Sequence, residues 1–341
     1  MHRLATVPGD PGPEGGIAFV EQPPAPVVLL SSADTDLLGI AALLRERPSH
    51  LGAELRALNL AALSHPAVLD NYVTHTLVHT TVLVVRLLGG RGHWSYGLER
   101  LRDWVAGDPG RKLLVLAGTA DEEQTLESLG TEDPLLCRAL AACFREGGPA
   151  NLLQVLDVLA ALLANRQPSI PTPLAAPDPE PHDWRDEPGE RIGLIVYRAW
   201  HQAGDLALVE ATLKALRQRG LAPRALWVSS LRDSAVQRGV ADLLGRERVR
   251  VVLCATGFAS VRFEEAGLGA PLWDRLGVPV LQLLCSTRGR SQWQASSIGL
   301  GPLDLTMQVA LPELDGRLTT RVGAFKEMER VSDQLNTALP T

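Results

Sequence analysis

Short runs of residues that are apolar throughout recur along this chain, and a segment with a helical pattern follows most of them. A strand without alternating polar residues is buried on both faces, which is typical of a parallel sheet covered by helices. The runs are Val27–Leu30, Thr81–Val85, Lys112–Ala117, Arg191–Tyr197, Ala225–Val228, Val251–Cys254 and Val278–Leu284. The sequence therefore predicts an α/β fold with doubly wound parallel sheets.

A proline-rich stretch divides this alternation into two halves. Residues 167–190 carry seven prolines among acidic residues and little that could form a core, which favours an extended, semi-rigid backbone. We therefore expect two doubly wound units joined by a Pro-rich linker: an N-terminal α/β unit over residues 1–166, the linker over 167–190, and a second, flavodoxin-like or Rossmann-like unit over 191–341.

The charge and composition exclude several classes of protein. A net charge of -6 argues against nucleic-acid binding, which needs a concentrated basic surface. The first residues, Met1–Gly9, hold no apolar run of signal-peptide length, and no uncharged stretch of membrane-spanning length occurs. The four cysteines lack the close pairing of a zinc knuckle or a disulfide scaffold. These features indicate a cytoplasmic protein that binds no membrane.

Motifs for nucleotide and metal chemistry are weak or absent in the sequence. It contains no G-x-x-x-x-G-K-[ST] phosphate loop, and the glycine cluster Gly89–Gly92 lacks the lysine and hydroxyl of one, so it indicates a tight turn. His75 and His79 have the i,i+4 spacing of a metal pair, but no third ligand is evident and two packed or surface histidines are favoured. Glu313 and Asp315 bracket a Pro…Asp-Gly turn. We predict no metal site, no tightly bound cofactor and no nucleophilic triad.

Loops at the carboxyl ends of the predicted strands are where ligands collect in open α/β sheets. The rule selects residues 31–34, 86–96, 198–205, 229–230 and 256–258. Each loop could equally be an ordinary capped βα turn.

Several segments of the chain resemble the CobN family, the large subunit of cobaltochelatase, which is related to the large subunit of magnesium chelatase. The matching segments run in order over nearly the whole sequence. They are Ser31–Asp36, Asn59–Pro66, Val82–Gly90 followed by Trp94–Glu99, Tyr197–Ala199 with Ala203–Asp205, Ala255–Ala259, Gly299–Leu305 and Leu311–Arg317 with Phe325–Glu327. Family members are several times longer, so the resemblance covers the N-terminal portion only. A fragment, a split subunit and a paralogue that kept only this portion all remain open.

The resemblance implies a role in ATP-dependent insertion of cobalt into hydrogenobyrinic acid a,c-diamide during cobalamin biosynthesis. Partner subunits of the AAA+ type would hydrolyse ATP, and the chain alone would be inactive as the metal–nitrogen ligase. The candidates for gripping the corrin are Arg86, Gly89, Gly90, Arg198, Gly204 and Thr256, and no residue is assigned as the catalytic base. Arg198 could instead pair with an acidic neighbour such as Asp205. The alternatives are a non-catalytic tetrapyrrole-binding or assembly module, or a relative of the magnesium-chelatase type.

Overall fold

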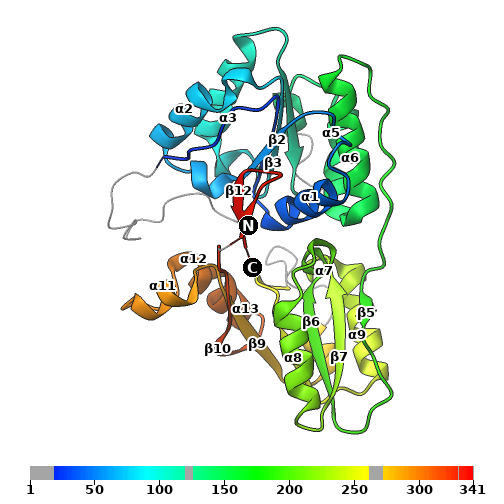
Figure 1. Cartoon of the computed structure of the whole chain (residues 1–341). Helices are drawn as coiled ribbons and strands as arrows, with labels where there is room; N and C mark the ends of the chain where they lie inside the picture. The colour runs from blue at the N-terminus through cyan, green and yellow to red at the C-terminus, as the bar shows by residue number, and fades with distance from the viewer. Residues whose placement is uncertain (1–18, 120–125, 261–271, 329, 341) are drawn as a thin grey trace. The chain divides into compact units, whose positions relative to one another are not determined.

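A computed structural model describes residues 19–119, 126–260, 272–328 and 330–340 of the chain (Figure 1). The chain forms two compact units, one made of Met1–Ala175 with Met328–Pro340 and the other of Ala176–Glu327. Each has its own sheet, in which the neighbouring strands are mostly parallel. The predicted α/β class with parallel sheets is confirmed. Within the described ranges, no helix is long and apolar enough to cross a membrane.

The first unit is built on a four-stranded parallel sheet. Its strands are β1 (Val27–Ser31), β2 (Leu55–Asn59), β3 (Val82–Leu87) and β4 (Lys112–Ala117), in the order β2-β1-β3-β4. All residues of the central strands β1 and β3 are buried, which explains why these strands are apolar nearly throughout. The sequence did not predict β2, because Arg56 and Asn59 interrupt its apolar residues.

Helices pack on both faces of this sheet. Those that bury Val27 and Leu29 are α1 (Asp34–Glu46), α5 (Pro134–Glu146) and α6 (Gly148–Leu163). Those on the face of Val28 and Leu30 are α2 (Pro66–His75) and α3 (Ser95–Ala106), with the short helices η1 (Leu60–Leu63) and η2 (Leu77–His79). The segment over residues 59–79 has a helical pattern with Pro66 inside it, and it forms three short helices. Pro66 begins α2, and His65 caps it by accepting from the Ala67 N–H at 3.2 Å.

The second unit contains a six-stranded sheet. Its strands are β5 (Glu180–His182), β6 (Arg191–Tyr197), β7 (Ala222–Val228), β8 (Val251–Cys254), β9 (Val280–Ser286) and β10 (Leu318–Phe325), in the order β10-β9-β8-β6-β7-β5. The strands from β6 to β10 are parallel, whereas β5 runs antiparallel to β7. The helices α7 (Arg198–Ala203) and α8 (Ala207–Arg217) pack on the face of Leu194, and α9 (Ser234–Arg246) and α10 (Leu272–Leu276) on that of Ile195. After β9 come α11 (Arg290–Ala295), α12 (Pro302–Asp304), the π-helix η7 (Leu305–Ala310) and α13 (Leu311–Leu314).

Apart from the antiparallel strand β5, the two sheets share one strand order, in which the first parallel strand lies between the second and the third. Thus β1 lies between β2 and β3, and β6 lies between β7 and β8. Such an order creates a topological switch point at the carboxyl ends of the first and third strands, where ligands bind in open α/β sheets. The switch points are therefore at the ends of β1 and β3 in the first unit and of β6 and β8 in the second.

The boundaries differ from the sequence prediction in two places. Residues 167–190 are not one free linker: Thr172 and Leu174 exchange hydrogen bonds with side chains of α6, and β5 joins the second sheet. The C-terminal hairpin of β11 (Arg330–Ser332) and β12 (Thr337–Leu339) belongs to the first unit and not to a second unit over 191–341. Leu335 and Leu339 are buried in the first core, and the Ala57 N–H donates to the Leu335 carbonyl at 3.2 Å.

Candidate functional site

At the switch point of the first unit, Arg86 lies in a buried ion pair. Its Nη1 donates to Asp36 Oδ2 at 2.8 Å, and the Ser31 hydroxyl donates to the same oxygen at 2.5 Å. Both charged side chains are only 7% exposed. Arg86, predicted from the sequence as a substrate-binding residue, is therefore paired with a carboxylate of the chain itself. Its contact with Asp36 fixes the end of β3 to α1.

Gly89 and Gly90 form the turn that follows β3. Their φ angles of +103° and +76° lie in the left-handed region that favours glycine. A Cβ atom on Gly89 would come within 2.6 Å of the His93 ring. The tight turn expected from the sequence is present, and His93 fills the space beside it.

Arg198 follows β6 at the switch point of the second unit and is 4% exposed. Its guanidinium donates to the Ala176 and Pro177 carbonyls at 3.2 and 3.3 Å and lies 3.5 Å from Asp178 Oδ2. An acidic residue does pair with Arg198, as the alternative interpretation expects, and that residue is Asp178. Arg198 thus anchors the proline-rich segment to the end of β6.

Gly204 and Thr256 also make their contacts within the second unit. Gly204 ends α7 with a φ of +75°, and its N–H donates to the His201 carbonyl at 3.1 Å. Thr256 is 1% exposed, and its hydroxyl lies 3.2 Å from Cys254 Sγ. Of the six residues selected from the sequence, the structure brings Arg198 and Thr256 to one switch point and Arg86, Gly89 and Gly90 to the other.

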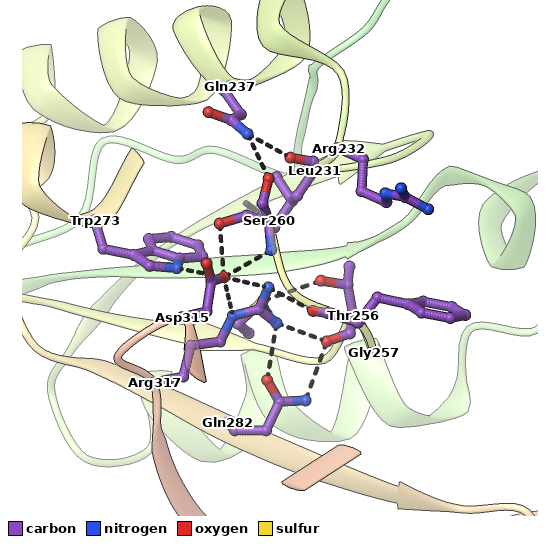
Figure 2. Close-up of polar contacts among 12 residues, drawn as sticks. Leu231, Arg232, Gln237, Thr256, Gly257, Ser260, Trp273, Gln282, Asp315 and Arg317 are labelled. Atoms are coloured by element: carbon purple, nitrogen blue, oxygen red, sulfur yellow. Dashed lines mark hydrogen bonds and ion pairs between the residues drawn. The ribbon is translucent and has the colours of Figure 1, made fainter. Parts of the chain in front are cut away.

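Sequence reasoning missed the centre of the second site, which is the ion pair of Asp315 and Arg317 (Figure 2). Neither side chain is exposed to solvent. Arg317 donates to the Thr256 carbonyl at 2.9 Å, to the Phe258 carbonyl at 2.9 Å and to Gln282 Oε1 at 3.0 Å. One buried guanidinium therefore satisfies acceptors on the loop after β8 and on β9 together.

The carboxylate of this pair ties the same loop to a helix. Asp315 Oδ2 accepts from the Ser260 N–H at 2.8 Å, from the Ser260 hydroxyl at 2.6 Å and from Trp273 Nε1 at 2.9 Å. The Trp273 ring also lies 5.3 Å from the Arg317 guanidinium. A buried charge is costly unless it is paired and hydrogen-bonded. All these bonds end on Oδ2, whereas the buried Oδ1 has no hydrogen-bond partner among the described residues. The bonds to Oδ2 hold the loop over residues 256–260 in place.

Phe258 has a backbone conformation that non-glycine residues rarely adopt. Its φ is +64°, its N–H donates to the Met307 carbonyl at 2.9 Å, and its carbonyl accepts from Arg317. Such a conformation costs about 1–3 kcal/mol and persists where its surroundings dictate it, typically at ligand-binding loops. Tyr197 supports the loop from β6 by donating to the Gly257 carbonyl at 3.3 Å, and burial raises the pKa of its hydroxyl. The loop is thus preformed at the switch point.

An exposed arginine stands beside this loop. Arg232 follows β7 and lies next to Leu231, whose carbonyl accepts from the Gln237 side chain at 2.8 Å. The same Gln237 amide donates to the Ser260 carbonyl at 2.8 Å, so the two loops share one tether. Figure 2 shows the Arg232 guanidinium directed away from the buried ion pair. No ion pair joins the Arg232 guanidinium to another residue within the described ranges, so among these residues it has no partner of the kind that holds Arg198.

A metal site is not formed by the described residues, among which no three His, Cys, Asp or Glu side chains gather around one point. The histidines His75 and His79 do not share a helical face, because α2 ends at His75 and His79 belongs to the separate helix η2. His75 Nδ1 lies 2.9 Å from the Asn71 carbonyl of its own helix.

A family model described as CobN/Magnesium Chelatase matches residues 141–340, which is more than half of the chain. The chain belongs to this family. Its match to the aerobic cobaltochelatase subunit CobN of Pseudomonas aeruginosa PAO1 is 34% identical and covers 96% of this chain but 27% of that subunit. The magnesium-chelatase H protein of Cereibacter sphaeroides is 29% identical over 46% of this chain and 13% of its own length.

A solved structure gives the same result. The catalytic subunit of cobaltochelatase from Mycobacterium tuberculosis superposes with a TM-score of 0.56 at 25% identity, over 92% of this chain and 26% of that subunit. The chain thus spans about a quarter of the length of the cobaltochelatase subunits that it matches. Similarity to both chelatase types marks it as a module related to tetrapyrrole chelatases.

Proposed function

We propose that this chain acts in the cytoplasm as the N-terminal portion of a cobaltochelatase large subunit and contributes to holding the corrin during cobalt insertion. The observation that carries the proposal is the 34% identity to a CobN subunit over 96% of the chain. The magnesium-chelatase relative matches over less than half of it, which favours the cobalt type. The substrate proposed is hydrogenobyrinic acid a,c-diamide, with cobalt as the second substrate.

The chain would act within a complex and not alone. Its sequence contains no phosphate loop, which supports assigning ATP hydrolysis to AAA+ partner subunits. Because the chain spans a quarter of its relatives, the group that takes the ring N–H protons is proposed to lie in the rest of the large subunit. The role left for this chain is to bind and orient the ring.

We place the ring at the switch point of β6 and β8, against the loop of residues 256–260. The ion pair of Asp315 and Arg317 fixes that loop in advance, so little ordering entropy is lost on binding. In place of the buried Arg198, Arg232 is the proposed partner for a carboxylate or amide side chain of the corrin, because its guanidinium is exposed and can form a two-donor fork.

Titration of hydrogenobyrinic acid a,c-diamide, followed by its absorbance, tests this placement. Removing a charge-assisted hydrogen bond costs about 1.5–3 kcal/mol, so Arg232→Ala should weaken binding about tenfold or more. Arg219→Ala is the matched control, because Arg219 is also exposed but precedes β7 at the opposite edge of the sheet. Equal affinity of the two variants would remove Arg232 from the site.

A further inference from the structure

In the turn from Glu313 to Leu318, charged side chains are buried and apolar side chains are exposed, the reverse of an ordinary surface turn. The side chains of Asp315 and Arg317 are fully buried, whereas Leu314 and Leu318 are 67% and 55% exposed. Charged side chains are almost never buried unless paired, and large apolar side chains are usually inside. Here the ion pair forces the leucines outward, because turning them inward would expose the pair and break its bonds to Ser260.

The exposed leucines adjoin an open sheet edge. Leu318 is the first residue of β10, the edge strand of the second sheet, and residues 318–321 are all exposed. Edge strands present unpaired backbone N–H and C=O groups that can pair with another strand. On its other side β10 pairs with β9 in regular register at Leu318 and Thr319, and register shifts follow beyond Thr319.

Exposed apolar side chains of the second unit are concentrated in this region. Among its described residues, the large apolar side chains with high exposure are Ile298, Leu305, Leu314 and Leu318. All four precede or begin β10, and α13 packs against both η7 and β10. The elements that carry Leu305, Leu314 and Leu318 are thus in contact. Exposed apolar side chains gathered on adjoining elements are typical of a protein–protein interface, whereas single exposed leucines are not.

We propose that Leu314, Leu318 and the adjoining edge of β10 form a docking surface for the part of a cobaltochelatase large subunit that this chain does not cover. The proposal rests on the proposed function. Its occupant is inferred from length, because the chain spans 27% of its CobN relative and 26% of the solved catalytic subunit. The surface also lies inside the segment that matches the family model, residues 141–340. An apolar patch with an open strand edge fits a partner that offers an apolar groove and a strand of its own.

Association of the full chain with a separate polypeptide tests the proposal. The probe is the part of the Pseudomonas aeruginosa CobN subunit that lies outside the match, with its folding checked by circular dichroism. The variant is Leu314→Glu/Leu318→Glu, in which both changed side chains are exposed and the fold should persist. The control is Leu135→Glu, since Leu135 is 56% exposed in the first unit. Wild type and control should bind alike, and the double variant at least about tenfold more weakly, because burying one leucine is worth about 1.5–3 kcal/mol.

The outcomes of this experiment decide whether the surface of Leu314 and Leu318 is a docking surface. Weaker association of the double variant alone, with unchanged corrin titration, supports the docking surface. A folded probe that does not bind the wild type, or binds the double variant equally well, overturns it. A wild-type dimer that the double variant converts to a monomer in light scattering also overturns it, in favour of a second copy as occupant. Corrin titration fails independently if the proposed function is wrong, so the two failures are distinguishable.

Discussion

Replacing Arg317 by methionine should destabilise the second unit more than any surface substitution. Met keeps much of the apolar stem but removes every donor, so the fully buried Asp315 carboxylate keeps only Ser260 and Trp273 as partners. The Phe258 carbonyl also loses the Arg317 donor, in a backbone conformation that costs energy to maintain. Breaking a buried pair by removing one partner costs about 3–5 kcal/mol, because the other charge remains without compensation.

Urea denaturation followed by tryptophan fluorescence measures this cost, since Trp273 lies 5.3 Å from the guanidinium. Arg321→Met is the matched control: Arg321 is exposed on β10, and its loss should stay within about 0.5 kcal/mol. The double variant Asp315→Asn/Arg317→Met removes both charges and should cost less than the sum of the single changes, by about 1–3 kcal/mol. The reasoning is refuted if Arg317→Met costs no more than Arg321→Met, or if the two single costs simply add.

Three further outcomes are expected. Burial raises the pKa of Cys137 and Cys285 to about 12 and of Cys143 to about 11, so at neutral pH these thiols should resist a disulfide reagent until urea unfolds the chain. Burial and then the neighbouring His201 lower the pKa of His182, so the unfolded chain binds more protons and the free energy of unfolding should fall as pH drops through about 6.5. In urea denaturation at several pH values, His182→Gln should reduce this pH dependence. An unchanged pH dependence of the unfolding free energy would contradict the prediction. Arg198→Ala should cost about 2–4 kcal/mol and speed proteolysis within residues 176–190, whereas an unchanged cleavage pattern would show that Arg198 does not anchor that segment.

The strands that could be predicted from the sequence are those with little polarity. Most central strands, such as β1 or β6, have an apolar run because helices cover both of their faces, although the buried Gln282 interrupts that of β9. The edge strands β2, β5 and β10 were missed: β2 contains Arg56 and Asn59, β5 has only three residues, and the first half of β10 is exposed. The edge strand β4 was predicted, because its residues are apolar and buried after Lys112. Where polar residues interrupt a strand or leave it exposed, the apolar pattern is lost and local sequence does not reveal the strand.

Strand topology predicted where the candidate site lies, but the sequence did not predict which side chains are buried there or what they contact. Arg86, near the end of β3, and Arg198, directly after β6, do lie at the switch points that the strand order creates. Their burial depends on Asp36 and Asp178, which lie 50 and 20 positions away in the sequence. Arg317 reaches the Thr256 carbonyl across 61 positions. A Pro…Asp-Gly-Arg segment indicates a turn whether its charges face solvent or core, so only the folded arrangement distinguishes the two.

The most direct test of the central claim is a comparison of two rings by equilibrium titration of the full chain. The claim that the chain holds a corrin for a cobaltochelatase predicts saturable binding of hydrogenobyrinic acid a,c-diamide, tighter than that of protoporphyrin IX, and weakened in Arg232→Ala but not in Arg219→Ala. Tighter binding of the porphyrin would point to the magnesium-chelatase type instead. Saturation by neither ring, with the chain folded and its docking to the remaining part of the large subunit intact, would contradict the claim.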